Sequence, residues 1–144
     1  MEKPLLEVKN LNKHFYGKQG AVIKAVNNVS FHIMKGETFG LVGESGCGKT
    51  TTGRTVIRLY KPTSGEVWFS GNRIDGPLTR EQTKAVTSKM QMIFQDPVAS
   101  LNPRMTVEEI ICEGAKINKL FSNRQEMRAA MERMLDLVGL TREH

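Results

Sequence analysis

The sequence predicts an α/β fold, with an antiparallel β part at the N-terminus, a glycine-rich loop in the middle and helices towards the C-terminus. Three observations lead to this prediction. Apolar and polar residues alternate in two early stretches, a short apolar run at residues 38–42 precedes closely spaced glycines, and helix-start patterns follow Pro103. The 144 residues are 39% hydrophobic and 25% charged, which is ordinary for a packed domain and excludes a disordered or collagen-like chain.

The N-terminal part predicts a pair of antiparallel strands. Residues 5–11 alternate apolar and polar after the first pair, and residues 22–33 do the same, with Val29, Phe31 and Ile33 on one face. Glycines at positions 17 and 20 supply the loop between the two strands. We therefore expect a β-hairpin with one buried and one solvated face.

The next predicted elements are strands around a single helix. Residues 38–42 form an apolar run typical of a strand buried on both faces. Apolar positions suit a helix over residues 51–60, and we expect Pro62 to end it because proline cannot continue the hydrogen-bond ladder. Residues 66–70 and residues 90–94 are strand-like as well.

Capping-box patterns predict three helix starts. Each pairs a Ser or Thr with a Gln or Glu three residues later: Thr79 with Gln82, Thr106 with Glu109, and Ser122 with Gln125. The last helix is expected to pack through one face, made of Met127, Met131, Met134, Leu135 and Val138. Gly139 is placed to close that helix.

The most informative residues are those at positions 43–50. They read Gly-Glu-Ser-Gly-Cys-Gly-Lys-Thr and match the phosphate-binding pattern G-x-x-x-x-G-K-[ST] between a predicted strand and a predicted helix. The three glycines let backbone amides turn towards phosphate oxygens, and the helix that follows presents its positive end to the same anion. Lys49 adds a charge for the β and γ phosphates, and Thr50 offers a hydroxyl to Mg²⁺.

Four segments resemble the ATP-binding subunits of ABC transporters, and within them the oligopeptide and dipeptide importer branch. These segments are residues 8–15, 40–51, 90–97 and 99–107, and the likeness as a whole runs from Pro4 to His144. It implies a P-loop nucleoside triphosphatase core with P-loop and Q-loop over residues 1–95, lacking the later strands. The start of an incomplete helical subdomain is implied over residues 96–144.

The resemblance also implies roles for single residues. The aromatic residue at the position of Phe15 stacks on adenine, and Gln95 matches the Q-loop glutamine that reaches Mg²⁺ and the attacking water. The implied nucleotide-binding residues of the loop are Gly43, Glu44, Ser45, Gly46, Cys47, Gly48, Lys49, Thr50 and Thr51. ATP and Mg²⁺ are the implied cofactors, with Thr50 and Gln95 on the metal and with Lys49 and Gln95 contributing to catalysis. The residues themselves also allow Phe15 to pack under the hairpin.

Hydrolysis of ATP in this family needs residues that come later in the sequence than the part this chain resembles. In the family, the signature motif, the Walker-B aspartate with its catalytic glutamate and the switch histidine all come after the position that corresponds to His144. We therefore expect this chain to bind ATP and not to hydrolyse it alone. Two alternatives stay open: a short non-hydrolysing nucleotide-binding or regulatory module, and a kinase-like P-loop phosphotransferase whose Walker-B strand ends at Asp96. Against the second, Gln95 stands where that aspartate should follow Phe94.

The charge pattern argues against nucleic acid as a partner. The chain has 21 Lys and Arg against 15 Asp and Glu, but the basic residues are scattered and not interleaved with aromatics for base stacking. No apolar run approaches the roughly 18 residues of a membrane helix, and Cys47 and Cys112 lack zinc-site spacing.

The resemblance implies that the partners are membrane-spanning permease subunits and a second ATP-binding subunit. It places the protein in the cytoplasm, peripheral on the inner face of the cell membrane through the permease. The solute stays open among oligopeptides, dipeptides and nickel.

Alkylation of Cys47 should block ATP binding, because the thiol lies inside the phosphate loop and an added group would occupy the space of the phosphates. Calorimetric titration with ATP before and after modification measures the effect. Unchanged nucleotide affinity after stoichiometric modification of Cys47 would contradict this prediction.

Overall fold

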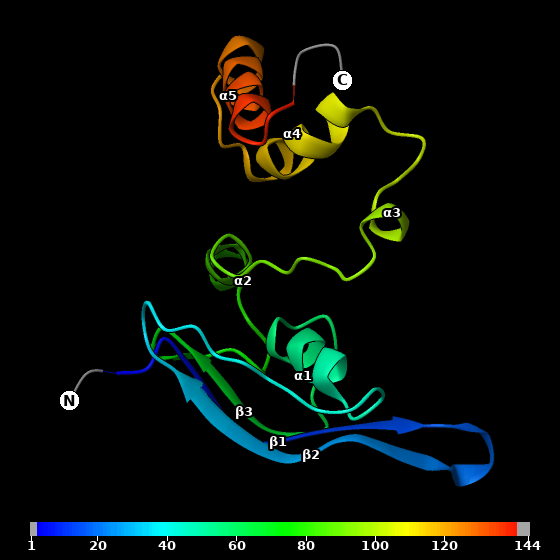
Figure 1. The fold of residues 1–144 in the computed structure, drawn as a ribbon. Coiled ribbons are helices and arrows are strands. Elements are labelled where there is room, and N and C mark those ends of the chain that lie inside the picture. The colour runs from blue at the N-terminus through cyan, green and yellow to red at the C-terminus, as the bar shows by residue number, and fades with distance from the viewer. Residues whose placement is uncertain (1–2, 141–144) are drawn as a thin grey trace. The chain divides into compact units, whose positions relative to one another are not determined.

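The structure, a computed structural model, describes residues 3–140 (Figure 1). The chain divides into two units, one ending at Met92 and the other beginning at Ile93. The first contains β1 (Leu6–Tyr16), the 3₁₀ turn η1 (Lys18–Gly20), β2 (Val22–Ile33), α1 (Lys49–Val56), β3 (Ser64–Phe69), β4 (Asn72–Arg73) and α2 (Arg80–Thr87). The second contains α3 (Pro97–Ser100), α4 (Val107–Asn118) and α5 (Arg124–Leu137). Residues 141–144 of the predicted helical part lie outside the described residues.

The predicted hairpin is confirmed. Strands β1 and β2 pair antiparallel, and they are connected by the turn η1, which follows Gly17 and ends with Gly20. Val29, Phe31 and Ile33 are half-buried, whereas Ser30 and His32 between them are exposed. The alternation in the sequence therefore corresponds to the two faces of the strand, as a side-chain period of two requires.

A four-stranded antiparallel sheet in the order β2-β1-β3-β4 supports the first unit. Helix α1 contacts β1 and β2, and Figure 1 shows it over one face of the sheet. The buried side chains form one cluster: Val8, Leu11, Val26, Val56, Val67, Ile74 and Val86. Burial of apolar surface contributes about 25 cal/mol per Å², so this cluster holds α1 on the sheet.

Two predicted strands do not form in the described part of the chain. Residues 38–42 and residues 90–94 are both irregular, and Val42 and Ile93 are 89% and 98% exposed. A strand needs a neighbour to accept and donate its backbone hydrogen bonds, and no strand of the described sheet pairs with either segment. The expectation of a buried strand at residues 38–42 is therefore wrong for this structure, because composition does not supply a pairing partner.

Helix α1 begins and ends earlier than predicted. It starts at Lys49, inside the phosphate-loop motif, and ends at Val56. The residues that follow form a turn in which Arg58 adopts a left-handed φ of 70°. A left-handed residue is a common way to end a helix. The helix therefore stops before Pro62 is reached, and the expected role of that proline as the terminator is wrong.

Two of the three predicted capping boxes are confirmed, those in front of α2 and α4. The Thr79 hydroxyl accepts from the N–H of Gln82 at 3.2 Å, and the Gln82 amide oxygen accepts from the N–H of Thr79 at 2.9 Å. Thr106 and Glu109 make the same reciprocal pair. Each box satisfies N–H groups that a helix start leaves without a partner.

The third predicted box is wrong, because α5 starts one residue later. Its N-cap is Asn123 and not Ser122, and the Asn123 side-chain oxygen accepts from the N–H of Glu126 at 2.9 Å. Asparagine is as good an N-cap as serine, so Ser122 and Asn123 are both suitable N-caps for this helix. Gly139, with φ of 74°, follows α5 as predicted.

The packed face of α5 is narrower than predicted. The cluster of the second unit consists of Cys112, Met131 and Leu135, with Ile111 and Met127 beside it. The other two residues of the predicted face, Met134 and Val138, are 51% and 70% exposed. Helix α4 is the element that contacts α5, and one helix covers only a strip of another.

Replacing Gly65 with alanine should destabilise the first unit. Gly65 has φ of 96°, and a Cβ there would stand 2.4 Å from the carbonyl oxygen of Asn10 and 2.7 Å from Cα of Leu11. These are backbone atoms of β1, so we expect the free energy of unfolding to fall by at least about 2 kcal/mol. Gly71 is the control, because it has φ of 77° and no atom within 4 Å of such a Cβ.

For Gly71→Ala the free energy of unfolding should fall by about 1 kcal/mol, from backbone strain alone. Urea unfolding followed by the fluorescence of the single tryptophan, Trp68, compares the two variants. Equal losses would contradict the steric argument.

Candidate functional site

The phosphate loop lies directly against the sheet. It is irregular from residue 43 to the start of α1, and Gly48, the residue before α1, has φ of 98°. A Cβ on Gly48 would stand 2.1 Å from the carbonyl oxygen of Ala25 in β2. Only glycine fits this approach, and the contact fixes where α1 begins relative to β2.

The loop also presents backbone donors without partners. In the part of the chain that the structure describes, the N–H groups of Ser45, Gly46, Gly48 and Lys49 donate to no protein acceptor. The positive end of the α1 dipole adds to them. A set of free N–H groups at a helix start is suited to bind a phosphate group.

The Lys49 side chain folds back over the loop. Its Nζ donates to the carbonyl oxygens of Gly43 at 2.7 Å and Glu44 at 2.5 Å, and it lies 3.5 Å from Sγ of Cys47. Phosphate oxygens are stronger acceptors for an ammonium group than neutral carbonyls. Cys47 is exposed whereas Cys112 is buried, so an alkylating reagent reaches the thiol of the loop first.

Threonines fill the first turns of α1. The hydroxyl of Thr55 donates to the carbonyl of Thr51 at 2.7 Å, and that of Thr52 donates to the carbonyl of Gly48 at 2.9 Å. Thr50 is exposed, and its hydroxyl makes no hydrogen bond within residues 3–140. Within the same residues, the hydroxyls of Thr50 and of the half-buried Thr51 are therefore available to a ligand, whereas those of Thr52 and Thr55 are engaged with backbone carbonyls.

Phe15 lies near the end of β1 with 36% of its surface exposed. Its ring meets the ring of Tyr60 in a T-shaped contact, with centroids 5.5 Å apart and planes at 89°. The neighbouring Tyr16 is 71% exposed. Sequence reasoning missed Tyr60, because it treated residues 57–60 only as the last turn of a predicted helix. The signal that could have found it was an aromatic residue directly before the Lys-Pro turn.

Gln95 and Asp96 belong to the second unit, where both are exposed. Oδ1 of Asp96 accepts from the N–H of Ala99 at 3.0 Å and so caps α3. A Walker-B aspartate ends a strand, whereas Asp96 precedes a helix and follows an irregular segment. The Walker-B alternative is therefore wrong, and the metal role of Gln95 stays a prediction.

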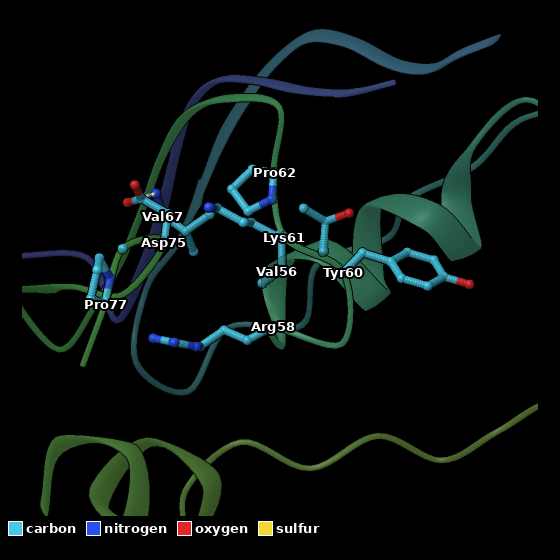
Figure 2. A pocket seen from close by; sticks show the side chains of 10 residues that line it. Val56, Arg58, Tyr60, Lys61, Pro62, Val67, Asp75 and Pro77 are labelled. Carbon is cyan, nitrogen blue, oxygen red and sulfur yellow. Dashed lines mark hydrogen bonds between the residues drawn. The ribbon is translucent and has the colours of Figure 1, made fainter. Parts of the chain in front are cut away.

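The first unit also contains a cavity of about 290 Å³ beyond the end of α1 (Figure 2). It is lined by Thr55, Val56, Arg58, Tyr60, Lys61, Pro62, Val67, Asp75, Gly76 and Pro77. Burial opposes ionisation of Asp75, but hydrogen bonds from Arg73 and from the N–H of Val67 outweigh it and hold the pKa of the carboxyl below its usual value. The carboxylate is satisfied by its own neighbours, and no predicted nucleotide-binding residue lines this cavity.

Curated relatives match the chain over its whole length. The oligopeptide transport ATP-binding protein OppF of Bacillus subtilis (strain 168) is 54% identical over 144 residues, which are 100% of this chain and 47% of that protein. The dipeptide transport ATP-binding protein DppF of Lactococcus lactis subsp. cremoris (strain MG1363) is 48% identical over 99% of this chain and 46% of its own length. The chain thus spans about half the length of these relatives.

Solved structures agree with the fold. The dimeric bacterial ABC transporter cassette MJ0796 matches with a TM-score of 0.81 and 26% identity, over 96% of this chain and 59% of that one. The same cassette in a post-hydrolysis state bound to ADP and Pi matches with a TM-score of 0.75 and 27% identity, with the same two coverages.

These matches confirm the α/β P-loop fold class and exclude the kinase-like alternative. The family model described as ABC transporter matches residues 26–144. Since this is most of the chain and includes the whole phosphate loop, the chain belongs to the ABC transporter family.

Proposed function

We propose that this chain is the nucleotide-binding, N-terminal part of an ATP-binding subunit that powers peptide import. The observation that carries the proposal is the phosphate loop, where free N–H groups and the Lys49 ammonium meet at the start of α1. The names of the relatives, oligopeptide and dipeptide transport ATP-binding proteins, support peptides as the solute.

Each group of the loop then has a task. The free N–H groups of Ser45, Gly46, Gly48 and Lys49 donate to phosphate oxygens, because several donors around one point suit a tetrahedral anion. The Lys49 ammonium exchanges its two carbonyl partners for β and γ phosphate oxygens. Phe15 stacks on adenine through its exposed surface.

Magnesium fits the types of oxygen at the start of α1. Within residues 3–140, no three His, Cys, Asp or Glu side chains gather where they could hold a metal ion. A metal in this site therefore depends on hydroxyl, amide, phosphate and water oxygens, which are the ligands that Mg²⁺ prefers. Thr50 is the proposed protein ligand in the first unit, and the ion would neutralise phosphate charge; the metal role of Gln95 stays a prediction from the family resemblance.

We further propose that the complete subunit pairs with a second ATP-binding subunit and docks on permease subunits at the cytoplasmic face of the membrane. The dimeric state of the solved cassette supports the pairing. Of the helices that the structure describes, none has the length and apolar character needed to cross a bilayer.

Replacing Lys49 with alanine should weaken MgATP binding at least about tenfold, since a charge-assisted hydrogen bond contributes about 1.5–3 kcal/mol. Lys18→Ala is the matched control: it removes the same charge from the turn η1, which contains no proposed site residue. Calorimetric titration of both variants measures the difference. Equal affinities for the two variants would contradict the proposed phosphate site.

A further inference from the structure

The proposed base-stacking residue belongs to a group of four side chains. This aromatic cluster consists of Lys13, Phe15, Arg54 and Tyr60. The Tyr60 ring meets the Phe15 ring at 89°, with 5.5 Å between centroids. Nζ of Lys13 lies 4.9 Å from the Phe15 centroid and 5.9 Å from the Tyr60 centroid. The Phe15 ring is therefore bordered by an aromatic ring and a cation, and part of its surface is exposed.

Tyr60 is itself held in place. Nη1 of Arg54 donates to the Tyr60 hydroxyl at 3.1 Å, and the guanidinium carbon lies 5.9 Å from the ring centroid. Lys13 donates to the carbonyl oxygen of Lys61 at 2.9 Å, which ties the residue after Tyr60 to β1. Figure 2 shows the Tyr60 ring pointing away from Arg58, on the opposite side of the turn. Tyr60 is also one of the residues that line the cavity, and the hydrogen bond from Arg54 gives its ring a defined place there.

We infer that Tyr60 is a positioning residue for the nucleotide base: its ring sets the orientation of Phe15. This inference rests on the proposed role of Phe15. An exposed aromatic side chain at a strand end rotates about two torsions, and an edge-to-face contact removes part of that freedom. Stacking on adenine then requires less ordering of Phe15 when the base arrives.

The hydrogen bond between Arg54 and Tyr60 links the proposed base site to the proposed phosphate site. Arg54 lies in α1, and α1 begins at Lys49. The helix that carries the phosphate-binding lysine therefore also carries the residue that holds Tyr60 against Phe15. A fixed distance between these two ends suits a ligand whose base and phosphates must bind together.

The test compares MgATP with magnesium tripolyphosphate, which has the phosphates and no base. Tyr60→Leu removes the ring, Tyr60→Phe keeps the ring and loses the hydrogen bond to Arg54, and Tyr16→Leu is the control on an aromatic residue outside the cluster. We expect Tyr60→Leu to weaken MgATP binding about three- to tenfold and to leave tripolyphosphate binding unchanged. Tyr60→Phe should retain most of the affinity, and Tyr16→Leu should match the parent chain.

Other outcomes overturn the inference. Unchanged MgATP binding by Tyr60→Leu would overturn it. An equal loss of affinity for MgATP and for magnesium tripolyphosphate would also overturn it, because Tyr60 would then support the phosphate loop. A base-selective loss in Phe15→Ala together with none in Tyr60→Leu would leave the role of Phe15 standing and remove that of Tyr60. If Phe15→Ala causes no base-selective loss of affinity, the proposed roles of Phe15 and of Tyr60 are both overturned.

A double variant gives a further check. If Tyr60 acts through Phe15, adding Tyr60→Leu to Phe15→Ala should cause no further loss of MgATP affinity. Additive losses would mean that Tyr60 acts on the base by itself, and would overturn its assignment as a positioning residue.

Discussion

The approach of the Gly48 backbone to the carbonyl oxygen of Ala25 is the contact on which the proposed nucleotide site depends. No side chain fits between the two, so α1 begins in direct contact with β2. From that fixed start, the buried residues Thr55 and Val56 reach the core of the sheet. The free N–H groups, Lys49 and Thr50 take their places from the same start. A side chain at position 48 would move all of them together.

Satisfied and unsatisfied polar groups are separated within the first unit. Arg73 pairs with Glu66 at 3.0 Å and with Asp75 at 3.0 Å, so each of these two carboxylates has a cationic partner. The phosphate loop instead leaves several N–H groups without an acceptor among the residues that the structure describes. Unpaired donors reduce stability unless a ligand or water takes them. This difference in hydrogen bonding favours the loop, and not the cavity beyond α1, as the proposed anion site.

Local chemistry accounts for the parts of the fold that the sequence predicted well. The capping boxes at Thr79 and Thr106 depend on residues three positions apart, and the β1–β2 hairpin depends on alternation and on two glycines. The phosphate loop belongs to the same class, because its pattern specifies backbone conformation over eight residues. The start of α5 was missed by one residue, since Ser122 and Asn123 are both good N-caps and only the folded chain chooses between them.

Contacts between distant residues decided the rest. Residues 38–42 and 90–94 have the composition of strands, but strand formation depends on a partner, and the described sheet provides none for them. The contact between Phe15 and Tyr60 joins residues far apart in the sequence, so no local pattern contains it. By itself, the sequence determined the phosphate loop, the hairpin and two helix caps, because each is a short-range arrangement of backbone and neighbouring side chains. Only the tertiary structure decided which apolar segments are covered and which side chains meet at Phe15, because burial and ring contacts depend on where separate elements pack.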